Sequence, residues 1–179
     1  MKVHEFTIIA SGLHPDADDL ANLFFGAGCD DAVLSFQKGV IIAEFDREAP
    51  SFSSAVISAC TDVLKTGANI ERIEPDHLVS LADMAKRTGL SRSALTNYHQ
   101  GERGENFPSP VARITSESPL WDWYEVATWL HGRERIGREI VVQARIVREA
   151  NILIETHSLE ADQFVTRMTE RVMELEGCD

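Results

Sequence analysis

Cysteine is scarce in this sequence, and the few that occur are far apart. The 179 residues contain only three, Cys29, Cys60 and Cys178. An odd number without close spacing argues against a disulfide framework or a zinc site, so we expect reduced thiols. The chain also lacks any run of about 18 apolar residues, which excludes a membrane-spanning helix, and its start lacks a secretory signal pattern. These absences favour a cytoplasmic protein.

Positive charge is also in short supply. The chain has 17 Lys and Arg against 29 Asp and Glu, a formal net charge of -12. Such an excess of negative charge argues against nucleic-acid binding, because phosphates require local positive potential. The charge is unevenly distributed, however: residues 1–78 carry -8, residues 79–136 carry zero, and residues 137–179 carry -4. Residues 86–113, with five Lys and Arg against two Glu, form the only locally basic stretch of that length.

Patterns that indicate catalysis are absent as well. We find no nucleophile with a nearby base, no phosphate-binding loop and no cofactor fingerprint. Asp16, Asp18 and Asp19 are close together, but they fall in the first turn of a predicted helix, where carboxylates complement the helix dipole. We therefore predict a protein that is not an enzyme and that has no catalytic residues, no metal site and no cofactor.

The first 78 residues have the pattern of an α+β domain. β-Branched and aromatic residues predict strands, and Gln37-Lys38-Gly39 predicts a hairpin turn between two of them. The predicted strands cover residues 3–12, 31–46 (a hairpin of two) and 68–76, and the predicted helices cover 15–28 and 49–67. This β-α-β-β-α-β order predicts a ferredoxin-like sandwich, in which two helices cover one face of an antiparallel sheet.

The stretch SLADMAKRTGLSRSALTNYHQGERG, residues 80–104, predicts two short helices joined by a tight turn. Ser80, with Asp83 three residues later, and Ser91 can each cap a helix. Gly89 can supply the positive φ that a sharp exit from the first helix requires. This spacing is typical of a helix-turn-helix. Its expected buried positions are Leu81, Ala85, Leu90, Leu95 and Tyr98.

The following residues sharpen this prediction. ENFPSPVARITSESPLW, residues 105–121, predicts a small hairpin, and Asp122 predicts the start of another helix, which contains Trp129. Residues 79–131 resemble the winged helix-turn-helix of the excisionase and MerR-like DNA-binding superfamily. In that superfamily a Phe-Pro-x-Pro sequence leads into the wing, and an aromatic residue followed by an acidic one begins a helix that ends in Trp-Leu. MerR regulators usually place this module first and follow it with a coiled coil, so their inducer chemistry does not transfer to this chain.

From this resemblance we expect a recognition helix near residues 91–101 in the major groove and a wing near residues 107–121. Arg92 can bond a guanine bidentately, and Asn97 or Gln100 can pair with adenine. The remaining candidates suit phosphates or base edges. The complete set is Lys86, Arg87, Ser91, Arg92, Ser93, Thr96, Asn97, Gln100, Arg103 and Arg113. The alternative to a DNA-binding surface here is an ordinary solvated helical face with capping serines. We assign Trp121, Trp123 and Trp129 to the core.

The last segment predicts two amphipathic helices, residues 137–158 and 159–177. Their apolar stripes are Ile140, Ala144, Val147 and Ile154, and Phe164, Met168, Val172 and Leu175. Asn151 falls within the first stripe, where a polar residue can fix the register of a helix pair. We expect this tail to form a homodimer, because a small module gains affinity from two half-sites. Packing against the first domain is the alternative.

The sequence as a whole predicts three segments: an α+β domain (1–78), a winged helix-turn-helix (79–136) and a C-terminal helical tail (137–179). The predicted function is sequence-specific binding of double-stranded DNA by a bacterial transcriptional regulator, whose acidic first domain binds a partner protein or an effector. The alternative is a protein-interaction module that does not bind DNA by itself, including an antitoxin-type or recombination accessory factor. Retention on heparin or DNA at low salt distinguishes the two.

Overall fold

The computed structural model describes residues 1–14, 19–156 and 161–176 and has an α+β fold. The chain divides into two compact units: unit 1 comprises Met1–Pro75 with Glu149–Asp179, and unit 2 comprises Asp76–Arg148. None of the helices in the described ranges has the length and apolar character needed to cross a bilayer.

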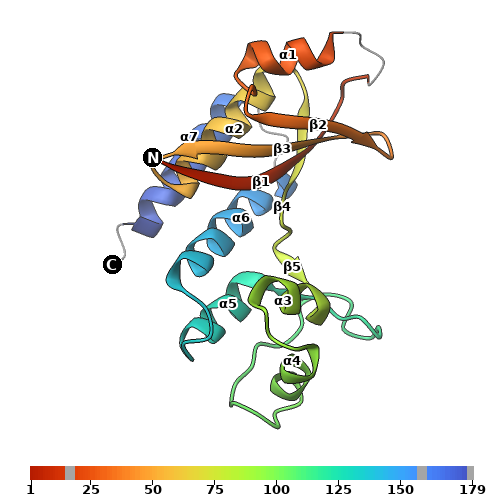
Figure 1. Ribbon diagram of the computed structural model, residues 1–179, viewed down its shortest axis with the longest axis vertical. Helices are drawn as coiled ribbons and strands as arrows, with labels where there is room; N and C mark the ends of the chain where they lie inside the picture. The colour runs from red at the N-terminus through yellow and green to blue at the C-terminus, as the bar shows by residue number, and fades with distance from the viewer. Residues whose placement is uncertain (15–18, 157–160, 177–179) are drawn as a thin grey trace. The chain divides into compact units, whose positions relative to one another are not determined.

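Unit 1 contains a four-stranded antiparallel sheet with the strand order β2-β3-β1-β4. Its first six elements follow the order predicted from the sequence (Figure 1). They are β1 (Lys2–Ser11), α1 (Leu20–Ala27), β2 (Ala32–Gln37), β3 (Val40–Ala49), α2 (Phe52–Lys65) and β4 (Asn69–Glu74). The predicted turn is present, with Lys38 and Gly39 at φ 53° and 83°, which allows a two-residue loop to connect β2 and β3.

One face of the sheet forms the core of unit 1. Alternate residues of β1 and β3 are buried, as expected for a sheet covered on one side. Helix α2 packs against β1, β3 and β4, and α1 packs against α2. Burial raises the pKa of the Cys29 thiol to about 12, with Asp62 adding to the effect, and burial also raises that of Cys60. Both cysteines are free thiols, while Cys178 lies outside the described residues.

The acidic residues before α1 differ in part from their predicted position. Asp19 is the residue that precedes the helix, and its side chain makes no capping hydrogen bond to a backbone N–H. It instead accepts a hydrogen bond from Asn22 Nδ2 at 2.7 Å. Asp19 therefore lies just outside the first helical turn, while Asp16 and Asp18 lie outside the described residues.

The two C-terminal helices, α6 (Arg138–Thr156) and α7 (Ala161–Glu176), are present as predicted. They do not form a separate unit. Helix α7 packs against α2, with Phe164 and Met168 buried, and α6 contributes its first part to unit 2 and its last part to unit 1. The apolar stripes that we expected at a dimer interface are therefore largely used within the chain.

Asn151 has a role different from the one that its position in the stripe suggested. It is 2% exposed, its Oδ1 accepts a hydrogen bond from Ile73 N at 2.7 Å, and its Nδ2 donates to Ile73 O at 2.9 Å. The side chain thus pairs with both backbone groups of one residue on the edge strand β4. Asn151 fixes α6 to the sheet of its own chain.

Unit 2 consists of three short helices, a small two-stranded sheet and the first part of α6. The elements are β5 (Leu78–Val79), α3 (Leu81–Thr88), α4 (Arg92–His99), β6 (Trp121–Asp122) and α5 (Trp123–His131). The sequence did not indicate β5 and β6, which are two residues each and pair with one another. This pairing joins residues 78–79 to unit 2, and Ala144 of α6 belongs to the same core. The boundaries at 75/76 and 148/149 therefore differ from those we predicted at 78/79 and 136/137.

Candidate nucleic-acid interface

Helix α3 begins at a complete capping box. The Ser80 hydroxyl accepts a hydrogen bond from Asp83 N at 3.2 Å, and an Asp83 carboxylate oxygen accepts one from Ser80 N at 3.0 Å. The Ser80 hydroxyl also donates to this carboxylate at 2.6 Å, and the two hydrogen bonds that Asp83 accepts, from the hydroxyl and from Ser80 N, hold the pKa of Asp83 below its ordinary value. Gly89 ends the helix with φ 70°, the left-handed conformation that glycine adopts at least cost.

Helix α4 follows after a short turn and has one covered side and one open side. Ser91 caps it by accepting a hydrogen bond from Ala94 N at 3.1 Å. Leu95 and Tyr98 are buried in the core of unit 2. Arg92 and Ser93 lie on the exposed side, so the helix offers a guanidinium and a hydroxyl to a ligand. The buried side of α4 is the one that we predicted from Leu95 and Tyr98.

The other candidates on and beside α4 differ in how far their side chains are available. Gln100 is exposed, whereas Thr96 and Asn97 are half-buried. The Thr96 hydroxyl donates to Arg92 O at 2.9 Å. The backbone carbonyl of Asn97, and not its side chain, accepts hydrogen bonds from Glu102 N and Arg103 N at 2.9 and 3.2 Å. Arg103 itself is exposed.

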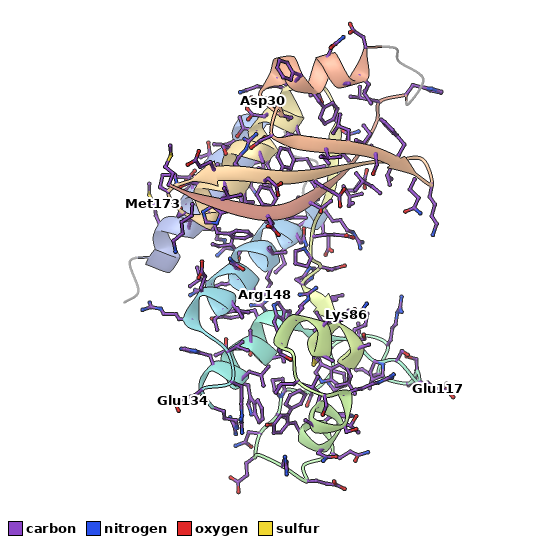
Figure 2. All side chains as sticks on the ribbon, in the orientation of Figure 1. Asp30, Lys86, Glu117, Glu134, Arg148 and Met173 are labelled. Carbon is purple, nitrogen blue, oxygen red and sulfur yellow. The ribbon has the colours of Figure 1, made fainter. Side chains whose placement is uncertain are left out.

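The two basic residues at the end of α3 are in different environments. Lys86 is exposed, and Arg87 is half-buried. Arg87 Nη2 donates to Asp76 O at 2.8 Å, and its guanidinium lies 5.3 Å from the centre of the Trp123 ring. Arg87 therefore helps to hold unit 2 together, whereas Lys86, labelled in Figure 2, is exposed.

The predicted wing is a small hairpin closed by three backbone hydrogen bonds. Leu120 O accepts from Val111 N and Ala112 N, and Ala112 O accepts from Leu120 N, at 2.8–3.2 Å. Arg113 is exposed and has φ 50°, which is uncommon for a residue with a side chain. The loop also carries Glu117, which phosphate would repel (Figure 2).

Tryptophans and neighbouring aromatic rings hold the loop after α4. Trp121 and Trp123 are buried, whereas Trp129 is half-buried, and Trp129 lies 5.0 Å from both Tyr98 and Phe107, ring centre to ring centre. Its Nε1 donates to Glu105 O at 3.0 Å. The prediction that all three tryptophans serve as core is confirmed for two, and the third packs at the edge of this core.

Sequence reasoning missed Arg133 and Gly104, which support the same loop. The Arg133 guanidinium lies 3.6 Å from the Trp129 ring centre, and its Nη2 donates to Glu105 O at 2.7 Å. A Cβ on Gly104 would approach Trp129 to 3.0 Å. The four-residue spacing of Trp129 and Arg133 along the chain is the only local signal that could have indicated the stacking.

The charge on Asp83 gives unit 2 a predictable dependence on pH. The pKa of Asp83 is lowered in the folded state. The contribution of its charge to the stability of unit 2 is therefore fully present above the carboxyl pKa of the unfolded chain, and it is lost as the pH falls through the pKa of the folded state. We expect Asp83→Asn to destabilise unit 2 by about 0.3–1 kcal/mol at pH 7 and by less at pH 3. Urea unfolding followed by tryptophan fluorescence measures the difference.

The exposed Glu102 provides the matched control for this prediction. Glu102→Gln removes one carboxylate from the same unit but no helix cap, so its unfolding midpoint should stay close to that of the wild type at both pH values. An Asp83→Asn deficit of equal size at pH 7 and pH 3 would show that the charge of Asp83 does not stabilise α3.

Comparisons with known proteins leave the fold and this surface as the evidence for function. No protein-family model, curated protein or solved structure matches the chain. Within the described residues, no group of three or more His, Cys, Asp or Glu side chains is arranged to hold a metal ion.

Proposed function

We propose that this protein binds double-stranded DNA sequence-specifically, as a transcriptional regulator, through α3, α4 and the hairpin of unit 2. The observation that carries the proposal is the two-sided character of α4. Leu95 and Tyr98 fix one side of the helix in the core, while Arg92 and Ser93 remain exposed on the other. A fixed helix with an exposed guanidinium is suited to reading base edges in the major groove.

The finer description of both units is part of this proposal. In unit 2, two capped helices joined at Gly89, followed by a hairpin and α5, support a winged helix-turn-helix. In unit 1, the strand order β2-β3-β1-β4 with α2 on one face supports a ferredoxin-like sandwich. These features agree with the resemblance carried by residues 79–131, and no activity beyond binding is needed to explain them.

The uncovered face of the unit 1 sheet supports the assignment of DNA binding to unit 2. Glu5 faces Asp46 across β1 and β3, and Thr7 faces Glu44 on one side and Glu74 on the other. Within the described part of the chain, Glu5, Glu44, Asp46 and Glu74 take part in no ion pair or side-chain hydrogen bond. Phosphate is repelled by such a face, so unspecific binding through unit 1 is suppressed.

Selection of a random DNA pool on the purified protein tests the proposal directly. We expect one recurrent sequence, whose affinity falls steeply with salt because counterions are released. Arg92→Ala should weaken binding to that sequence by about 1–3 kcal/mol and relax the preference for one guanine. Titration of the selected and a scrambled duplex over a salt series measures both effects.

Two further variants separate reading of bases from charge alone. Lys86→Ala should weaken binding to the selected and the scrambled duplex equally and reduce the salt slope by about one. Lys2→Ala removes one exposed cation from unit 1 and should change neither. If no sequence is enriched and the protein is not retained on DNA at low salt, DNA binding is contradicted, and docking of a protein becomes the better explanation of unit 2, whose hairpin exposes Val111 and Ile114.

A further inference from the structure

The two edge strands of the unit 1 sheet differ in how well their backbone groups are covered. The outer strands are β2 and β4. On β4, the Asn151 side chain bonds both the N–H and the C=O of Ile73, and the strand carries Glu71, Arg72 and Glu74. Such a cover and such charges prevent another strand from pairing there.

Strand β2 has neither protection. Its sequence, AVLSFQ, contains no charged residue and no proline, and Val33 and Phe36 are 67% and 44% exposed. An uncharged, partly apolar edge strand is a template for pairing with a further strand. Its backbone geometry determines which pairing is favoured.

The outward-facing groups of β2 follow from its pairing with β3. Asp46 N donates to Asp31 O at 3.1 Å, which makes this the hydrogen-bonded pair next to Ala32 and Phe45. Because bonded and non-bonded pairs alternate in an antiparallel ladder, the N–H and C=O groups of Leu34 and Phe36 face away from β3. No hydrogen bond from any described residue reaches these four groups.

We propose that β2 pairs with β2 of a second copy of this chain, antiparallel and about a two-fold axis at Ser35. This register places Leu34 opposite Phe36 of the second copy and joins all four outward groups of each strand to partners. A register centred on Leu34 would instead require Ala32 N–H, which already donates to Cys29 O at 3.2 Å.

A second copy is the occupant that suits this edge because the strand is complementary to itself. In the proposed register Leu34 meets Phe36 on one face of the sheet, and Val33 meets Gln37 on the other, so no charge faces another. Two chains that each carry a net charge of -12 thus meet where neither brings a charge. The pairing does not rest on DNA binding, but it would supply the two copies of unit 2 that a palindromic site requires.

The mass in solution tests the pairing without DNA, so its outcome is independent of the proposed function. Light scattering after size exclusion, over a concentration series, should give twice the 19.9 kDa of the chain. Phe36→Lys should give a monomer, because it places a charged side chain opposite Leu34 of the second copy, and charged side chains on an edge strand prevent pairing. Its far-ultraviolet circular dichroism spectrum should be unchanged, because Phe36 is 44% exposed. Phe25→Lys, at an exposed residue of α1 (67%), is the control and should remain a dimer.

A designed disulfide tests the register. In a Cys178→Ser background, Ser35→Cys should link two copies on mild oxidation, because facing residues of a non-bonded pair have Cα atoms about 4.5 Å apart, within disulfide range. Cys29 and Cys60 are buried and should not react. Val33→Cys should stay unlinked, because residue 33 faces Gln37 of the second copy. A monomeric wild type, a dimer that survives Phe36→Lys, or equal linking through residues 33 and 35 would each overturn the proposal.

Discussion

Replacement of Arg47 by Met is expected to destabilise unit 1 by about 3–5 kcal/mol. Arg47 is 7% exposed on the covered face of β3. Its Nε and Nη2 donate to the two Asp31 carboxylate oxygens, both at 2.8 Å, and its Nη1 donates to Asp62 at 2.7 Å. The methionine side chain fills much of the same volume, but it leaves two partly buried carboxylates without this cation.

Urea unfolding followed by two signals locates the effect. All three tryptophans lie in unit 2, so their fluorescence reports that unit, whereas far-ultraviolet circular dichroism reports both. We expect Arg47→Met to lower the midpoint of the dichroism transition attributable to unit 1. Lys65→Met is the matched control, since Lys65 also contacts Asp62 at 2.8 Å but its side chain is 56% exposed, and it should cost less than about 1 kcal/mol.

Removal of the acidic partners tests whether unpaired charge is the cause. A variant that combines Arg47→Met with Asp31→Asn and Asp62→Asn should regain part of the lost stability, because breaking a buried pair costs more than replacing all of its members. An Arg47→Met protein as stable as the wild type would show that the network of Arg47, Asp31 and Asp62 makes no net contribution to unit 1.

The features that the sequence predicted well depend on neighbouring residues. Ser80 with Asp83, Gly89 and Ser91 define helix ends through hydrogen bonds and dihedral angles within a few residues, and Lys38-Gly39 does the same for the hairpin in unit 1. The alternation in β1 and β3 likewise follows from the period of a strand. These signals were sufficient for the order of the elements from β1 to β4 in unit 1 and for the helices of unit 2.

The features that the sequence could not predict depend on partners far apart in the chain. Strands β5 and β6 are too short for a periodic pattern and pair across about forty residues. The position of Asn151 in the apolar stripe predicts a register device, but its partner is Ile73, 78 residues away in the sequence. On α4, the buried side was predictable, because burial of Leu95 and Tyr98 follows from helical spacing. The engagement of Arg87 with Asp76 and Trp123 was not.

The second large effect is expected at Asn151. Asn151→Leu should destabilise unit 1 by about 2–6 kcal/mol, because it removes the partners of two Ile73 backbone groups, each costing about 1–3 kcal/mol when buried without one. Ile152→Ala, at the next residue of α6 and 37% exposed, is the control and should cost much less. Urea unfolding measures the loss of stability, and hydrogen exchange at the Ile73 amide shows whether the loss arises at this strand edge.

Asn151→Asp separates the two hydrogen bonds. Its carboxylate can still accept from Ile73 N, as Oδ1 of asparagine does at 2.7 Å, but it cannot donate to Ile73 O and it buries a charge. We therefore expect Asn151→Asp to be at least as destabilised as Asn151→Leu at neutral pH, although aspartate differs from asparagine in only one terminal group. If the Ile73 amide exchanged as slowly in Asn151→Leu as in the wild type, the edge of β4 would be protected by the packing of α6 alone.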